Sequence, residues 1–174
     1  MKIASDWISI STTALIAILI ASLFYLSAKH TNELEKQSRT YYSVVWASDI
    51  FYKIDQAASE LTDLNTHNAD ASGRMPFQDL HYVSSDKAIE SRVFIILNQY
   101  NALGSALREN LIDLEKIKGL RKHTIEQTRV LFEVYLAQYR DQINAVAWCD
   151  FEYLYTQVTN NAIFSPPKSC NIKD

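Results

Sequence analysis

The chain is poor in the residues that make tight turns, with three glycines and three prolines among 174 residues. So few turn residues argue against a many-stranded sheet, and the composition also excludes collagen-like and disordered chains. Neither sign of charge dominates, because 17 Lys and Arg oppose 20 Asp and Glu for a net charge of −3. The charge therefore gives no case for nucleic-acid binding, and we expect no duplex nucleic acid among the partners.

Motifs of catalysis and metal binding are also missing from the sequence. It has no glycine-rich phosphate loop, no cysteine pair at metal-ligand spacing, no two histidines on one helical face and no nucleophile elbow. We therefore expect no catalytic residue, no metal and no cofactor. The spacing of Arg74 and His81 is loosely similar to that in small helical ribonucleases, which leaves a divergent helical nuclease as a third hypothesis.

One long uncharged stretch is present, Ile8–Leu26. As a helix rising 1.5 Å per residue it spans about 28 Å, close to the hydrocarbon thickness of a bilayer. Trp7 and Tyr25 place aromatic residues at its two ends. A cleaved signal peptide is the alternative, but the available cut sites lack a small residue at one of the two required positions. We predict a retained transmembrane anchor over residues 1–28.

Basic residues predict the orientation of this anchor. Lys29, Lys36 and Arg39 follow the stretch, whereas Lys2 alone precedes it. This bias predicts a single-pass protein of the bacterial inner membrane with its C-terminal domain in the cytoplasm. In that reducing compartment neither Cys149 nor Cys170 needs a partner; in the reverse topology the two would become disulfide candidates.

Small residues recur every four positions within the anchor and form one smooth stripe on a helix. Such a stripe lets a second backbone approach closely and favours self-association in the membrane, although small residues are common in any spanning helix. The stripe consists of Ser9, Thr13, Ala17 and Ala21.

The rest of the chain has helical periodicity, so we predict an all-α protein with a four- to five-helix bundle after the transmembrane helix. A helical stem over 29–64 either continues the anchor or breaks near residues 30–32. Its apolar seam has 3-4 spacing, which favours assembly. The seam residues are Val44, Ala47, Phe51, Ile54, Ala58 and Leu61.

Turn-forming residues predict a linker over 65–84, followed by a bundle domain over 85–164 and a tail over 165–174. We expect the first bundle helix to be capped by Ser84 or Ser85 and to pack closely at Gly104. The further helices are expected at 111–118, ended by Gly119, then at 124–146 and 147–161. Asp150 and Glu152 are expected on the wet face of the last one.

A cluster of basic residues surrounds Gly119, where we expect one helix to end and the next to begin. Such a place can hold an anion, either a lipid headgroup or a phosphate-bearing ligand. The alternative is a solvated loop whose cations complement Asp113, Glu115 and Glu126. The basic cluster comprises Arg108, Lys116, Lys118, Arg121, Lys122 and His123.

Three segments carry a resemblance to a known family: Ile96-Leu97-Asn98 followed by Tyr100, then Leu111–Glu115, then an aromatic helix with Tyr135 and Arg140. They resemble a bacterial family of small single-span membrane proteins with a cytoplasmic helical domain of unknown function. That family usually has an acidic residue where this chain has Asn101. The resemblance implies the fold and the topology. The layout alone is also similar to membrane-anchored accessory effectors of antiphage and CRISPR systems.

Our first hypothesis is a non-catalytic inner-membrane protein whose cytoplasmic domain self-associates, docks a partner, or does both. The second is an oligomeric, ligand-switched effector of antiphage defence that permeabilises the membrane, with the basic cluster as its ligand site.

Overall fold

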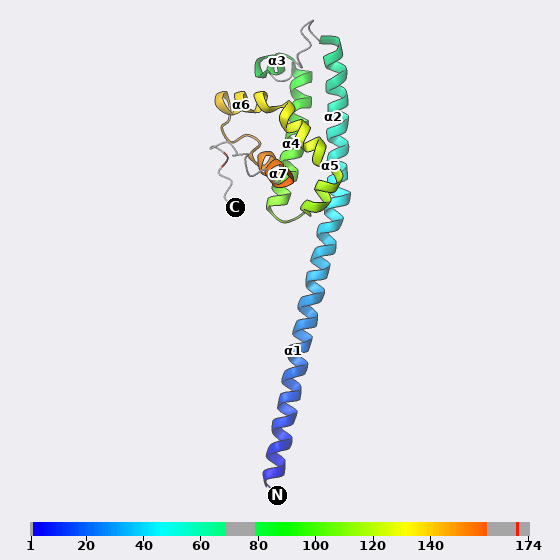
Figure 1. Ribbon diagram of the computed structural model, residues 1–174, viewed down its shortest axis with the longest axis vertical. Coiled ribbons are helices and arrows are strands. Elements are labelled where there is room, and N and C mark those ends of the chain that lie inside the picture. Colours follow the sequence, from blue (N-terminus) through cyan, green and yellow to red (C-terminus); the bar gives the residue numbers. More distant parts are fainter. Residues whose placement is uncertain (1, 69–78, 160–169, 171–174) are drawn as a thin grey trace. The chain divides into compact units, whose positions relative to one another are not determined.

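The computed structural model describes the backbone of residues 2–68, 79–159 and 170, and the side chains of residues 18–64, 79–159 and 170. Within these residues it contains helices and no strand, which confirms the all-α class (Figure 1). The chain divides into two compact units, residues 1–38 and 39–174. We refer to the second unit as the domain.

The first unit consists of the greater part of α1, Lys2–Tyr41, which has no break at residues 30–32. The large apolar side chains between Ile18 and Leu26 expose 49% to 70% of their surface. None of the helices in the described part of the chain combines the length and the apolarity that a bilayer crossing requires. Residues 8–17 of the predicted anchor lie outside the residues whose side chains are described, so the anchor stays a prediction.

A π-helical turn, η1 (Tyr42–Trp46), separates α1 from α2 (Ala47–Asn68). Because a π turn holds an extra residue, it shifts the helical face by about one position. Ser43 is consequently buried and Val44 is 43% exposed, so the first residue of the predicted seam lies at the surface of the domain. The Ser43 hydroxyl donates to the Arg39 carbonyl oxygen and accepts from the Asp113 amide, which ties η1 to the start of α5.

The core of the domain is organised around α4, Lys87–Arg108, which contacts both α2 and α7, Cys149–Thr159 (Figure 1). The α5 helix, Leu114–Leu131, contacts α7 and η1, and α6, Glu133–Gln142, contacts the short α3, Leu80–Ser85. Apolar residues of α4 at helical spacing supply much of the buried surface: Ile89, Val93, Ile96, Leu97, Tyr100, Leu103 and Leu107.

The predicted start of the first bundle helix is wrong. Ser84 and Ser85 already belong to α3, so neither of them caps α4. The carboxylate of Asp86 performs this role, because its Oδ1 accepts from the amides of Ala88 and Ile89. The predicted linker is also too long at both ends, since α2 extends to Asn68 and α3 begins at Leu80. Residues 69–78 lie outside the described residues.

The helix boundaries around Gly119 are displaced from those expected. The α5 helix begins after the Asp113 cap and passes through Gly119, and the non-helical φ and ψ of Arg121, −147° and 17°, divide it into two helical segments at a kink. Gly119 has no close neighbour and no positive φ, so nothing in its surroundings ends the helix there. The expected helix over 124–146 is divided, because α5 ends at Leu131 and α6 occupies 133–142. The last helix begins at Cys149, immediately after Trp148 with its φ of 53°.

Candidate functional site

A buried carboxylate lies at the centre of the domain, between two arginines from different helices. Glu152 of α7 has no exposed surface. Its Oε2 accepts from Nε of Arg129 at 2.7 Å, and its Oε1 accepts from Nη1 of Arg140 at 2.6 Å. Arg129 comes from α5 and Arg140 from α6, so the network joins three helices. We call these three residues the Arg–Glu–Arg network.

The expectation that Asp150 and Glu152 both lie on the wet face of the last helix is wrong for Glu152. Two residues that are two positions apart on a helix do not share a face. Asp150 is partly exposed and pairs with Arg108, with 2.8 Å between Oδ1 and Nη2. Glu152 points to the opposite side, into the core.

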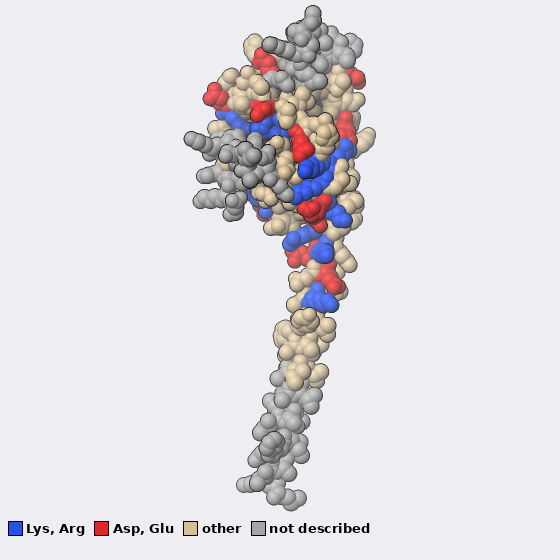
Figure 2. All heavy atoms as spheres, in the orientation of Figure 1, with Lys and Arg blue, Asp and Glu red and all other residues tan. Residues whose placement is uncertain are grey.

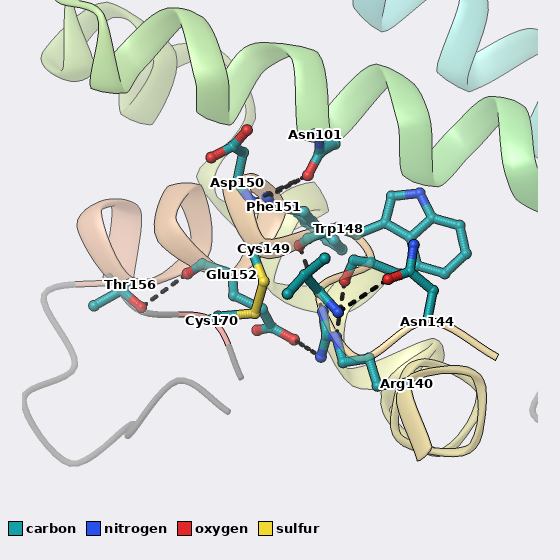
Figure 3. The surroundings of a disulfide bond; sticks show 12 residues. Asn101, Arg140, Asn144, Trp148, Cys149, Asp150, Phe151, Glu152, Thr156 and Cys170 are labelled. Atoms are coloured by element: carbon teal, nitrogen blue, oxygen red, sulfur yellow. Dashed lines mark hydrogen bonds and ion pairs between the residues drawn. A yellow bond between two sulfur atoms is a disulfide. The ribbon is translucent and has the colours of Figure 1, made fainter. Parts of the chain in front are cut away.

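Arg140 has a second role, because it also binds the turn that precedes α7. Its Nε donates to the Ala147 carbonyl oxygen at 2.8 Å, and its Nη2 donates to that of Trp148 at 3.4 Å. These carbonyl groups precede the first turn of α7, so one guanidinium orients both the helix and its entry turn (Figure 3). Charge-assisted hydrogen bonds of this kind are the stronger ones in proteins.

The N-terminus of α7 is held against α4 by a cap from another helix. Asn101 Oδ1 accepts from the amides of Asp150 at 3.0 Å and Phe151 at 3.2 Å, which the helix itself leaves without partners (Figure 3). A Cβ on Gly104 would lie 1.8 Å from the Asp150 carbonyl oxygen, so only glycine permits this approach. The predicted close packing at Gly104 is confirmed.

Aromatic rings surround the turn before α7. Trp148 lies 4.6 Å from Tyr139, 5.4 Å from Phe94 and 6.1 Å from Tyr135, measured between ring centroids. The indole Nε1 of Trp148 donates to Asn98 Oδ1 at 2.8 Å. Burial, and next the nearby Tyr139, raise the pKa of Tyr135 far above its ordinary value. This phenol is therefore neutral at physiological pH and unsuited to serve as a base there.

The two cysteines form a disulfide, Cys149–Cys170, with 5.2 Å between their Cα atoms (Figure 3). This is the pairing expected for the reverse topology, in which the two cysteines become disulfide candidates. Cys149 is the first residue of α7, and Cys170 is 4% exposed. The bond thus fastens a residue of the predicted tail to the helix that carries Glu152.

The predicted anion site is not assembled as expected. It requires a helix start just after Gly119; α5 has a kink there, at Arg121, and the amides at the start of α5 are bound by Asp113. Three of its basic residues also pair with carboxylates in the domain. Arg121 pairs with Asp55 of α2, Lys118 with Glu115 and Lys122 with Glu126.

Arg108 pairs with Asp150 and lies 5.0 Å from the Tyr153 ring centroid, away from that group. Lys116 and His123 are exposed on α5. On the face shown in Figure 2, basic and acidic side chains lie beside one another over the domain. Lys118 and Lys122 thus pair with two of the carboxylates named in the alternative, Glu115 and Glu126, whereas Arg121 and Arg108 pair with others.

The other predicted site residues are distributed as follows. Ala47, Phe51, Ile54 and Leu61 are buried within the domain, where α2 packs on α4, and Ala58 is partly buried.

Of the small-residue stripe, Ala21 is exposed, and Ser9, Thr13 and Ala17 lie outside the residues with described side chains. Arg74 also lies outside the described residues, and His81 is exposed on α3. Among the described residues no group of His, Cys, Asp or Glu side chains is arranged to hold a metal ion.

An apolar cavity of about 320 Å³ opens beside the π turn. It is lined by Tyr42, Trp46, Ala106, Leu111 and Ile112. Tyr42 is 49% exposed and Leu111 is 56% exposed, so large apolar side chains border it at the surface. We call these five residues the η1 surface.

Sequence reasoning missed the Arg–Glu–Arg network, although a signal was present. Arg129 lies four residues after Ile125 and three before Phe132, inside an apolar stripe, and Glu152 lies four residues after Trp148 in another. Charged residues at core positions indicate buried partners, because an unpaired buried charge is too costly to maintain. Which helix supplies the partner is not visible from spacing.

These observations describe an all-α domain built on a buried ion-pair network and an interhelical cap. A family model for a domain of unknown function, DUF4760, matches residues 11–158. Since the match covers most of the chain, the protein belongs to this family. Searches of curated proteins and of solved structures gave no match.

Proposed function

We propose that this chain is a single-span protein of the bacterial inner membrane whose domain works by association and not by catalysis. The uncharged run Ile8–Leu26 supports the span through its length and its aromatic ends. The apolar side chains from Ile18 to Leu26 are also exposed along α1, and a contiguous apolar surface of this kind needs a cover such as lipid.

The non-catalytic proposal rests on how the charged side chains inside the domain are paired. Both carboxylate oxygens of Glu152 accept hydrogen bonds from arginines, and the side chain has no surface exposed to water. A general acid or base must reach the proton that it transfers, either directly or through one water. A carboxylate with no exposed surface and two arginine partners supports the fold of the domain instead.

The surface that we assign to association is the η1 surface, and its proposed occupant is a second copy of this chain. Exposed Tyr42 and Leu111 border an apolar cavity large enough to receive side chains from another molecule. Copies that share one membrane plane encounter each other at a raised effective concentration, so a weak apolar contact suffices. The small-residue stripe predicted within the anchor favours the same partner.

The oligomeric state of the intact chain in lipid nanodiscs or mild detergent tests this proposal. We expect wild type to be a dimer or larger by light scattering, and Leu111→Glu to weaken association at least tenfold. Ile143→Glu is the matched control, because Ile143 is 58% exposed against 56% for Leu111 and lies away from the η1 surface. A wild-type chain that is monomeric in the bilayer mimic would overturn self-association, and recovery of the full chain in the aqueous phase would overturn the span.

The ligand-switched effector of antiphage defence remains an alternative hypothesis from the sequence. It requires an anion to displace the carboxylates that now accompany Lys118, Arg121 and Lys122. Vesicle leakage that depends on a phosphate-bearing ligand, and is lost when Lys116, Lys118, Arg121 and Lys122 are all changed to Ala, would favour the effector over the association proposal.

A further inference from the structure

The disulfide bears on the side of the membrane that the domain occupies. Cys149 and Cys170 are joined across a separation of 21 residues, and they account for both cysteines of the chain. Bacterial proteins keep such bonds in the periplasm or outside the cell, whereas the cytoplasm maintains thiols in reduced form. A structural disulfide is therefore evidence about the compartment in which the domain lies.

The basic residues point the other way, but their difference is small. Lys29, Lys36 and Arg39 follow the predicted anchor, while Lys2 precedes it. The positive-inside rule is a bias in the number of basic residues that flank a span. The disulfide depends instead on a chemical reaction that one compartment permits and the other opposes.

We infer that the domain lies in an oxidising compartment, with the residues that precede the anchor on the reducing side, the reverse of the orientation that the basic residues predict. The part of this inference that concerns sidedness rests on the proposed anchor; the oxidised state of the cysteines does not. Residues 39–174 then form an extracytoplasmic domain.

Bond formation follows ordinary thiol–disulfide exchange with the disulfide of a thiol oxidase protein. One cysteine thiolate of the chain attacks a sulfur of that disulfide and releases one oxidase thiolate. The second cysteine thiolate then attacks the mixed disulfide. The chain loses two electrons and two protons, the oxidase disulfide gains them as two thiols, and the Cys149–Cys170 bond remains.

The position of the bond indicates what it does. Cys149 and Glu152 are three residues apart on α7 and so share a helical face, and Cys170 is buried where it meets Cys149 (Figure 3). The bond therefore holds part of the tail against the first turn of α7, on the face that carries Glu152 of the Arg–Glu–Arg network. Closing a segment of this length is expected to raise the folding equilibrium constant on the order of a hundredfold.

The thiol state in cells tests the inference. Cells that express the full chain are quenched in acid, their free thiols are blocked with N-ethylmaleimide, and the membrane and aqueous fractions are separated. Each denatured fraction is then reduced and treated with a maleimide–polyethylene glycol reagent. We expect two additions per chain after reduction and none without it. Because the count is made on denatured protein, it does not depend on folding of any variant.

Cys149→Ser and Cys170→Ser are the controls, and each is expected to give no addition, since its remaining thiol is blocked in the first step. No addition to the wild-type chain would mean free thiols in the cell and would overturn the inference, even if the chain is in the membrane fraction. Two additions to a chain in the aqueous fraction would support the oxidising compartment while overturning the anchor. Protease added outside intact spheroplasts should degrade the domain; protection would overturn the reversed orientation.

Discussion

Arg140 donates from Nη1 to Oε1 of Glu152 at 2.6 Å, and both side chains are buried. The same guanidinium binds the carbonyl oxygens of Ala147 and Trp148, which lead into the helix that carries Glu152. Arg140 of α6 thus orients α7 through two sets of contacts, one with the carboxylate of Glu152 and one with the turn that precedes the helix. Arg129 of α5 binds the other oxygen of the same carboxylate at 2.7 Å.

Neutralising Glu152 should destabilise the domain strongly. Glu152→Gln removes the buried negative charge that both guanidinium groups face, although Arg129 also lies 4.0 Å from the exposed Glu133 carboxylate. Breaking a buried ion pair from one side costs about 3–5 kcal/mol. We expect the free energy of unfolding of the full chain to fall by about 3 kcal/mol, measured by urea denaturation in detergent with far-UV circular dichroism.

The matched control is Asp150→Asn, which makes the same chemical change two residues earlier. Its pair with Arg108 is partly exposed, so we expect a loss below about 1 kcal/mol. Equal losses in the two variants would contradict a special role for the buried network.

Substitution by alanine should lower the stability of the domain at Gly104 and raise it at Gly119. Gly104→Ala would place Cβ 1.8 Å from the Asp150 carbonyl oxygen, so α4 and α7 must separate. We expect a loss of about 3 kcal/mol or more, typical of severe overpacking. Gly119→Ala meets no atom within 4 Å inside α5 and should stabilise by about 0.5–1 kcal/mol. Thermal unfolding midpoints of the two variants decide this; a tolerated Gly104→Ala would refute the close approach.

Substitution of Asn101 by an acidic residue should reduce the stability less than substitution by an apolar residue. Its Oδ1 accepts from the amides of Asp150 and Phe151, a role that a carboxylate also performs and that the helix dipole favours. We expect Asn101→Asp to keep the stability within about 0.5 kcal/mol and Asn101→Leu to lose about 1–2 kcal/mol. Chemical denaturation of both variants measures the difference, and an Asn101→Leu chain as stable as wild type would disprove the cap.

Stability should fall at high pH because of buried Tyr100. Burial raises the pKa of Tyr100 from 10.0 to about 12, opposed by its hydrogen bond with Thr128. The folded state therefore favours the neutral phenol. Its contribution is complete below pH 10, the unfolded pKa, and is lost as the pH rises through about 12. At one pKa unit per 1.36 kcal/mol the change is on the order of 3 kcal/mol.

Thermal midpoints recorded at pH values between 9 and 12 measure this loss, and Tyr100→Phe should flatten the dependence in part. The remaining slope is expected to come from other phenols, including Tyr135, whose pKa is also raised by burial. A variant with the same slope as wild type would show that Tyr100 ionises freely in the folded state.

The helical class and most of the buried stripe on α2 were predictable, because periodicity is a local property of the chain. Ala47, Phe51, Ile54 and Leu61 are buried as the 3-4 spacing indicates. Val44 departs from the pattern because the π turn adds a residue to the repeat, which an assumed period of 3.6 cannot detect. Helix starts were predicted poorly where the N-cap is an acidic residue: Asp86 caps α4 in place of the expected Ser84 or Ser85, and α5 begins after Asp113 and not at Leu111.

The sequence by itself determined that the chain is helical, that its charges nearly balance and that one uncharged run precedes the rest. The tertiary structure decided which polar side chains are buried and with whom they pair. Arg129, Arg140 and Glu152 come from three helices, and Asn101 caps a helix about fifty residues further along the chain. Such pairings follow from the packing of helices against one another, which periodicity within one helix does not contain.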